Sequence, residues 1–141
     1  MRTLFETLSS SLVDDSKANI FVIVKPGFLK FTQYVIDTFE QQGWEVERIK
    51  TKQLLPEEAK ILYEPHKKED FFKDLCEYMS SDLTTAILFT KKDSEMSEDM
   101  FDETNGIKDK IRGEIGESEM RNGIHSSDSL ERLQIERGIY F

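Results

Sequence analysis

The sequence predicts a single α+β domain, built from a four-stranded antiparallel sheet covered by helices. Three observations carry this prediction. Four short segments have the composition of β-strands, and the segments between them repeat apolar residues at helical spacing. The chain has 141 residues, of which 38% are hydrophobic and 33% are charged. That length and that composition suit one globular domain with one core.

The first half of the chain holds two of the expected strands. Residues 19–25 are a continuous run of β-branched and aromatic residues, which is typical of a buried strand. A helix is expected over residues 28–42, because its aromatic and aliphatic residues fall on one stripe. Residues 44–52 alternate between apolar and charged side chains. That alternation predicts a half-exposed strand, with an irregularity near Arg48.

The second half of the chain is mostly helical. The expected helices cover residues 55–63, 70–80, 94–101 and 129–137. The expected strands cover residues 84–90 and 122–125. Residues 104–116 are expected to be a loop with one helical turn near Lys110. The larger elements then follow the order β-α-β-β-α-β, which is the ferredoxin-like arrangement, and we expect the helices on one face of the sheet.

The N-terminal segment is expected to be an extension of the domain. In residues 1–18, several apolar residues have roughly helical spacing, namely Leu4, Phe5, Leu8 and Leu12. We therefore expect a short amphipathic helix there, with a packing role and no chemistry. The functional domain is expected to span residues 19–141.

Charge and composition exclude several classes of function. The net charge of −9 at pH 7 argues against general nucleic-acid binding, which needs a basic face. An acidic chain can still bind a nucleotide where a few basic groups converge. No apolar run approaches the ~20 residues of a membrane span, and no secretory signal is recognisable. Cys76 is the only cysteine, which fits a reducing, cytoplasmic compartment.

The segment with the most distinctive chemistry runs from Asn122 to Ser129 and reads Asn-Gly-Ile-His-Ser-Ser-Asp-Ser. An imidazole titrates near neutral pH, so His125 can be a neutral nucleophile or a base. The surrounding hydroxyl and backbone N–H groups can hold an anion. Taken alone, the same pattern is also compatible with a structural or surface histidine.

This segment resembles the active-site signature of the nucleoside diphosphate kinases, Asn-x-x-His-(Gly/Ala)-Ser-Asp-Ser. Ser126 stands at the position that is small in the family. The family's chains end in Glu-Ile-x-Leu-Trp-Phe or similar, and this chain ends in Glu-Arg-Gly-Ile-Tyr-Phe from Glu136 onward. The resemblance therefore covers both the histidine motif and the C-terminal run, in the family's order.

Further motifs of the same family occur upstream. They are Lys25-Pro26, Tyr63 with Phe71-Phe72 at the family's spacing, Thr104-Asn105, and Arg112-Gly113. The resemblance implies that Lys25, Thr104 and Arg112 contact phosphate. It also implies that Phe71 stacks on the base, although the two aromatics Tyr63 and Phe71 suit a core equally well.

The resemblance implies a ping-pong phosphotransferase. His125 would take the γ-phosphoryl group from a nucleoside triphosphate such as ATP, and a nucleoside diphosphate would then accept it. Ser127 and Glu136 would orient His125, and Asn122 would bond the ribose or the phosphates. Tyr63 would lie near the histidine. Mg²⁺, as the cofactor, would be held mainly by the nucleotide's own phosphates.

Three features depart from the family pattern. Gly27 replaces an aspartate, Glu98 stands where a second phosphate-binding arginine is usual, and the segment between Thr104 and Arg112 is shortened. They leave two alternatives open: a nucleotide-binding or interaction module with little kinase activity, or protein histidine phosphotransfer. In the family the shortened segment also builds trimer contacts. The chain is therefore expected to be a homodimer or a monomer, and not a hexamer.

Overall fold

The computed structural model describes residues 17–141. The expected N-terminal helix falls on residues 1–16 and so lies outside the described residues. Of the predicted extension only Lys17 and Ala18 are described, and Ala18 already begins the first strand, β1 (Ala18–Val24).

The sheet has four antiparallel strands, as predicted. They are β1, β2 (Trp44–Gln53), β3 (Leu83–Lys91) and β4 (Ile124–Ser126), and they lie in the order β2-β3-β1-β4. All three strand pairs are antiparallel. The register of β2 against β3 shifts between Val46 and Arg48, which confirms the predicted irregularity and lets β2 twist there.

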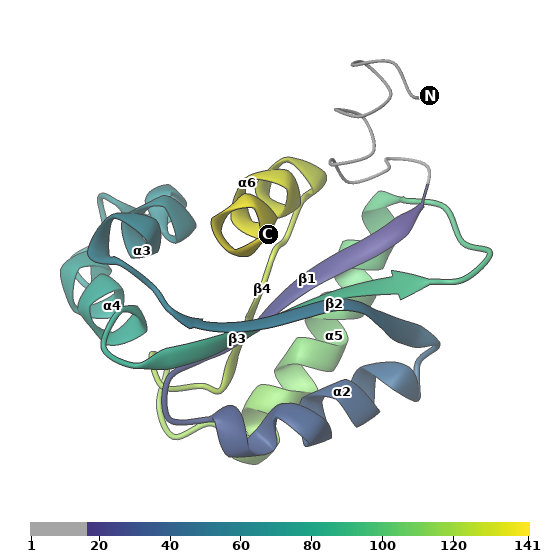
Figure 1. Ribbon diagram of the computed structural model, residues 1–141, viewed down its shortest axis with the longest axis horizontal. Coiled ribbons are helices and arrows are strands. Elements are labelled where there is room, and N and C mark those ends of the chain that lie inside the picture. Colours follow the sequence, from purple (N-terminus) through teal and green to yellow (C-terminus); the bar gives the residue numbers. More distant parts are fainter. Residues whose placement is uncertain (1–16) are drawn as a thin grey trace.

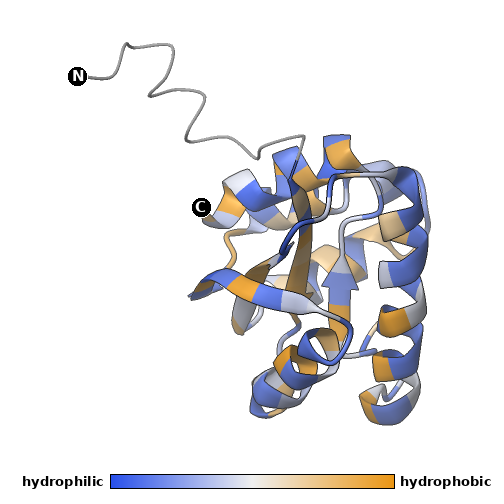
Figure 2. Cartoon of the chain, turned by 90° about the vertical axis from the view of Figure 1, so that its right-hand side faces the viewer, coloured by the Kyte–Doolittle hydropathy of each residue, from blue (hydrophilic) through white to orange (hydrophobic). Residues whose placement is uncertain are grey.

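Helices cover both faces of the sheet (Figure 1). On one face lie α2 (Thr32–Glu40), entered through the 3-10 turn Leu29–Phe31, and α5 (Glu98–Ile115). On the other lie α3 (Pro56–Leu62), α4 (Phe72–Met79) and α6 (Leu130–Tyr140). The helices carry hydrophobic residues among hydrophilic ones, as expected of helices that bury one side against a sheet (Figure 2).

The expectation of helices on one face was wrong, and β1 shows why. Its seven residues are all buried. Ile20 and Val22 belong to the core cluster beneath α2 and α5, whereas Phe21 and Ile23 belong to the cluster beneath α3, α4 and α6. A strand covered on both faces reads as a continuous apolar run rather than as an alternation.

The expected loop over residues 104–116 was also wrong, because α5 is one continuous helix of 18 residues. Its buried residues recur at helical spacing: Phe101, Thr104, Ile107 and Ile111. A glycine inside a helix costs about 1 kcal/mol relative to alanine, and Gly106 and Gly113 weaken the local signal accordingly. Burial of the apolar stripe against β1 and β4 outweighs that cost.

The topology brings the end of β1 beside β4. His125 pairs with Ile23 in the sheet, and Lys25 follows β1 directly. Ser129 ends the next turn and caps α6, its hydroxyl accepting a hydrogen bond from the Arg132 amide at 3.2 Å. The chain therefore returns α6 across the face that carries α3. Among residues 17–141, no helix is long and apolar enough to cross a membrane.

Candidate active site

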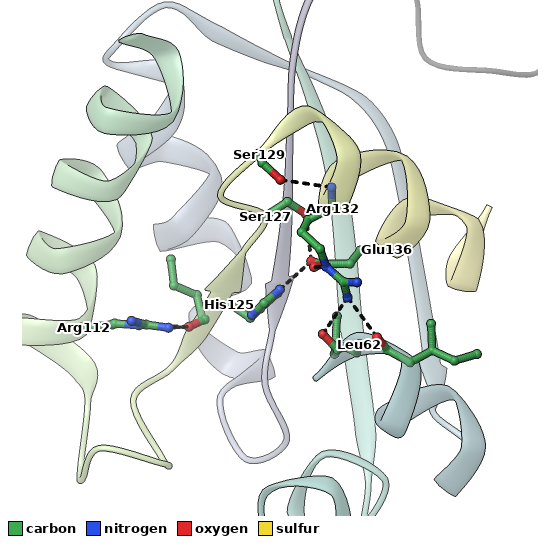
Figure 3. Close-up of polar contacts among 9 residues, drawn as sticks. Leu62, Arg112, His125, Ser127, Ser129, Arg132 and Glu136 are labelled. Atoms are coloured by element: carbon green, nitrogen blue, oxygen red, sulfur yellow. Dashed lines mark hydrogen bonds and ion pairs between the residues drawn. The ribbon is translucent and has the colours of Figure 1, made fainter. Parts of the chain in front are cut away.

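The site is centred on His125, which projects from β4 toward α6 (Figure 3). Its Nε2 lies 2.6 Å from Oε1 of Glu136. The histidine side chain is 16% exposed and that of Glu136 only 3%. Glu136 is therefore almost completely shielded from water, whereas the imidazole keeps a small exposed fraction that a ligand can reach.

Glu136 is held by three donors. Oε1 receives the His125 contact and a hydrogen bond of 2.8 Å from the Ser127 hydroxyl, and Oε2 accepts one of 3.0 Å from Nε of Arg132. Burial by itself raises the pKa of this carboxyl group. The bonds from His125, Ser127 and Arg132 outweigh burial, so the pKa of Glu136 is lowered overall and the group is ionised at neutral pH.

This contact decides which nitrogen of His125 is free. A carboxylate only accepts, so the Nε2 beside it carries the proton and Nδ1 keeps a lone pair. Burial lowers the pKa of His125, and Lys25 and Lys108 lower it further, against the opposing effect of Glu136. A neutral, oriented imidazole with a free Nδ1 is a competent nucleophile.

Three cations converge on the same place, and we call Lys25, Lys108 and Arg112 the cation cluster. Lys25 is 3% exposed, and its Nζ donates to the Met120 carbonyl at 3.2 Å. Burial, followed by the charges of Arg112 and Lys108, lowers the pKa of Lys25 to about 7. Arg112 donates through Nε and Nη2 to the carbonyl of Ile124, at 3.1 and 2.9 Å.

The cation cluster has no carboxylate partner. None of its three members forms an ion pair with any residue from 17 to 141. Burial, followed by Arg112, also lowers the pKa of Lys108. Asp109, Asp128 and Glu136 act on Lys108 from further away, and Asp109 also acts on Arg112. In a chain of net charge −9, buried and half-buried cations that repel one another and form no ion pair indicate an anion-binding site.

Aromatic rings lead from the nucleophile to the surface. Tyr63 follows α3 and packs edge-on to His125, with ring centroids 5.4 Å apart. His66 stands between Tyr63 and Phe71, at 6.4 and 5.6 Å from their rings. Phe71 is 44% exposed, whereas Tyr63 is buried. The exposed ring at the entrance is available to stack on a flat ligand.

Two predicted ligand residues lie differently from the rest. Thr104 is fully buried in the middle of α5, and its hydroxyl donates to the Met100 carbonyl at 2.6 Å. The structure therefore does not present it to the site. Asn122 lies just before β4, where its Nδ2 donates to the Glu119 carbonyl at 2.7 Å. Its Oδ1 is buried without a partner in the described chain.

The structure also accounts for Gly27. This residue has φ +87°, and a Cβ there would come within 2.8 Å of Nη2 of Arg121. An aspartate would be strained by this left-handed backbone conformation, even if the flexible Arg121 side chain moved aside. Glu98 opens α5 in its first turn, where an acidic residue stabilises the helix. The nearby Lys91 forms an ion pair of 3.1 Å with Glu103, and its ammonium group also lies over the Trp44 ring.

Sequence reasoning missed two residues of the site. Lys108 lies one helical turn before Arg112 on the same face of α5. Because residues 104–116 were expected to form a loop, the sequence did not predict this shared face. Arg132 lies one turn before Glu136 on α6 and binds it. For Arg132 the signal was present, because i, i+4 pairs of opposite charge are neighbours on any helix.

The described residues offer no metal site of their own. Between residues 17 and 141, no group of three or more His, Cys, Asp or Glu side chains could hold a metal ion.

Comparison with known proteins identifies relatives over nearly the whole chain. The family model described as nucleoside diphosphate kinase matches residues 19–141. A nucleoside diphosphate kinase of Campylobacter jejuni is 35% identical over 125 residues, covering 84% of this chain and 91% of that protein. One of Helicobacter pylori is 34% identical over 131 residues, covering 89% of this chain and 96% of that protein.

Solved structures agree with the fold. A crystal form of the Aquifex aeolicus nucleoside diphosphate kinase superposes with a TM-score of 0.76 at 27% identity, and it covers 89% of this chain and 96% of that chain. The Encephalitozoon cuniculi nucleoside diphosphate kinase gives a TM-score of 0.72 at 22% identity, covering 87% and 88% of the two chains. The second likeness concerns the fold alone.

Proposed function

The chain belongs to the nucleoside diphosphate kinase family, and from this premise we propose that its phosphotransfer proceeds by a ping-pong mechanism through a phosphohistidine on His125. The observation that carries the proposal is the 2.6 Å contact between Nε2 of His125 and Oε1 of Glu136. It leaves Nδ1 free beside the cation cluster. The closeness of nucleophile, orienting carboxylate and candidate anion-binding groups supports this proposal.

The proposed step breaks one phosphorus–oxygen bond and forms one phosphorus–nitrogen bond. The Nδ1 lone pair attacks the γ-phosphorus of a nucleoside triphosphate, and the bridging oxygen leaves with its electron pair on the diphosphate product. In the second half-reaction, a terminal oxygen of another nucleoside diphosphate attacks the same phosphorus and His125 is regenerated. Glu136 balances the charge that develops on the imidazole, and Ser127 holds Glu136 in place.

Binding of the nucleotide is assigned to two groups of residues. Lys25 and Arg112 would contact the transferring phosphoryl group, with Lys108 beside them. Phe71 would stack on the base, which tolerates any base because each has a π-face. Asn122, with its unpartnered Oδ1, would accept a hydrogen bond from a ribose hydroxyl. The assignment does not extend to Thr104, because its hydroxyl is already used inside α5.

Mg²⁺ is proposed as part of the substrate, bound to the phosphate oxygens of the nucleotide. Bound there, Mg²⁺ would neutralise part of the phosphate charge, and the cation cluster would orient the phosphate oxygens. A cytoplasmic location completes the proposal, supported by the single free cysteine, Cys76.

Labelling with γ-phosphate-labelled ATP, followed by a chase with several nucleoside diphosphates, tests the function. We expect label on histidine that is stable to base, labile to acid, and released to the diphosphates. Label that survives the chase and moves only to a protein acceptor would replace the proposal with protein histidine phosphotransfer. Nucleotide binding without any label would indicate a binding module instead.

The lowered pKa of Lys25 predicts that nucleotide affinity weakens as the pH rises above about 7. A bound anion favours the protonated lysine and so raises the pKa of Lys25 in the complex. Between the free and bound pKa values, binding must take up a proton. Calorimetry of ADP binding at pH 8, in two buffers of different ionisation enthalpy, measures that uptake. Lys25→Met should abolish it, and an uptake of zero in the unmodified protein would contradict the assignment.

We further propose that the protein is a homodimer or a monomer. Within residues 17–141, the outer edge of β2 has no partner strand, and the apolar residues Val46 and Ile49 on β2 are 37% and 50% exposed. Light scattering should give 16.5 kDa or twice that mass per particle. Ile49→Lys should dissociate a dimer, whereas Ile61→Lys on α3 should not. A mass six times 16.5 kDa would contradict the proposal.

A further inference from the structure

Arg132 connects two parts of the site that are far apart in the sequence (Figure 3). Its Nε donates to Oε2 of Glu136 at 3.0 Å, and its Nη2 donates to the carbonyls of Ile61 and Leu62 at 2.9 and 3.1 Å. The side chain is only 15% exposed. One guanidinium group therefore contacts both the carboxylate that orients His125 and the last turn of α3.

Each end of this contact has a consequence for the site. The carbonyls at the C-terminus of a helix lack partners within the helix and carry partial negative charge, so a guanidinium group stabilises them. Tyr63 follows those carbonyls directly as the last residue of the helical turn, and its ring packs against His125. Fixing the end of α3 thus fixes the Tyr63 ring relative to the imidazole.

We propose that Arg132 is a positioning residue for phosphoryl transfer. It holds Glu136 and the C-terminal end of α3, next to Tyr63, in fixed positions around His125. The inference rests on the proposed function and goes beyond it, since Arg132 itself touches neither nucleotide nor phosphoryl group. Arginine suits the role because its planar fork makes several bonds in fixed directions. A lysine has one ammonium group and cannot bridge a carboxylate and two carbonyls with that geometry.

Arg132 also shapes the charge that His125 meets. The cations around the imidazole are Lys25 after β1, Lys108 and Arg112 on α5, and Arg132 on α6. The other titratable groups are Tyr63 after α3, Glu136 on α6, and Asp128 in the turn before α6. Arg132 donates to the second oxygen of Glu136 and offsets part of its negative charge, so the carboxylate orients the imidazole while favouring its protonated form less strongly. Removing this positive charge must raise the pKa of His125 and reduce its neutral fraction at a given pH.

The test compares three variants. Arg132→Met keeps the packing of the side chain and loses the charge, and Arg132→Lys keeps the charge and loses the fork. The matched control is Glu131→Ala, the exposed neighbour on the same helix. Two measurements are made: the titration of the His125 ring by NMR, and kcat and KM for phosphoryl transfer. The titration is made without nucleotide, so it is independent of catalysis.

For Arg132→Met we expect a raised pKa of His125 and a kcat reduced on the order of 10-fold, as misplacement of a catalytic group produces, with KM nearly unchanged. Arg132→Lys should leave the pKa of His125 close to its original value while kcat remains low. Glu131→Ala should change neither.

A folded Arg132→Met variant with an unchanged His125 titration and unchanged kcat would overturn the inference, even if its Tm were lower. The proposed function fails separately, if the unmodified protein forms no phosphohistidine. In that event the NMR titration still decides whether Arg132 acts on His125.

Discussion

Replacing His125 with alanine is expected to abolish phosphoenzyme formation, with a loss in kcat/KM of about 10⁴-fold or more, as removal of a nucleophile generally produces. Among residues 17–141, no other side chain stands beside the cation cluster with a carboxylate oriented on it. The fold should survive, because β4 pairs with β1 through backbone groups, and Glu136 keeps its bonds from Ser127 and Arg132.

The measurement is incorporation of label from γ-labelled ATP, with circular dichroism as a check on folding. His66→Ala is the matched control, since His66 is an exposed histidine in the turn between α3 and α4. It should leave labelling nearly intact. Label on the His125→Ala variant at the level of the unmodified protein would show that the nucleophile lies elsewhere.

Substituting Arg112 or Lys108, the two members of the cation cluster on α5, should produce the second largest loss of kcat/KM. Arg112→Ala deletes charge-assisted hydrogen bonds to phosphate, each worth roughly 1.5–3 kcal/mol. That range corresponds to a fall in kcat/KM of about 10- to 100-fold. Lys108→Ala should cause a smaller fall of the same kind. Arg112 and Lys108 share one helix face and one ligand, so their effects should not be additive.

Kinetic constants for both single variants and for the double variant measure this coupling. Lys110→Ala is the control, because Lys110 is an exposed lysine on the same helix, and its removal should change little. Lys91, which pairs with Glu103, should also be dispensable for activity. A Lys108→Ala variant with unaltered kinetics, together with a Lys91→Ala variant that loses activity, would place the additional cation on β3.

The position of Glu98 has a different meaning in the folded protein from the one that the family pattern suggests. The family resemblance makes it a lost phosphate-binding arginine. In the structure it stands in the first turn of α5, where a negative charge is favourable to the helix. Lys108 lies further along the same helix and already contributes positive charge at His125. The shortened segment thus continues α5 and brings Lys108 to the site.

Much of this protein follows from its sequence alone. The apolar run of β1, the irregularity in β2 and the position of His125 on a short strand are local patterns, because strand composition and alternation report how each residue is buried. The order of the family motifs predicted that the site contains His125, Lys25, Arg112, Ser127 and Glu136. Their meeting in one place is consistent with that order.

Other features depend on contacts between distant segments, and only the tertiary structure decides them. The pattern of β1 is the same whichever helices cover its two faces, so the two-sided packing was not readable. The two glycines of α5 lower its local helical signal, and burial of its apolar stripe supplies the stability that the sequence lacks. Burial of Thr104 follows from that helix, and so does the placing of Lys108 beside Arg112. Arg132 reaches the carbonyls of Ile61 and Leu62 only because α6 returns across the sheet beside α3. Contacts across such long separations form when the core closes, and no short window of sequence contains both partners.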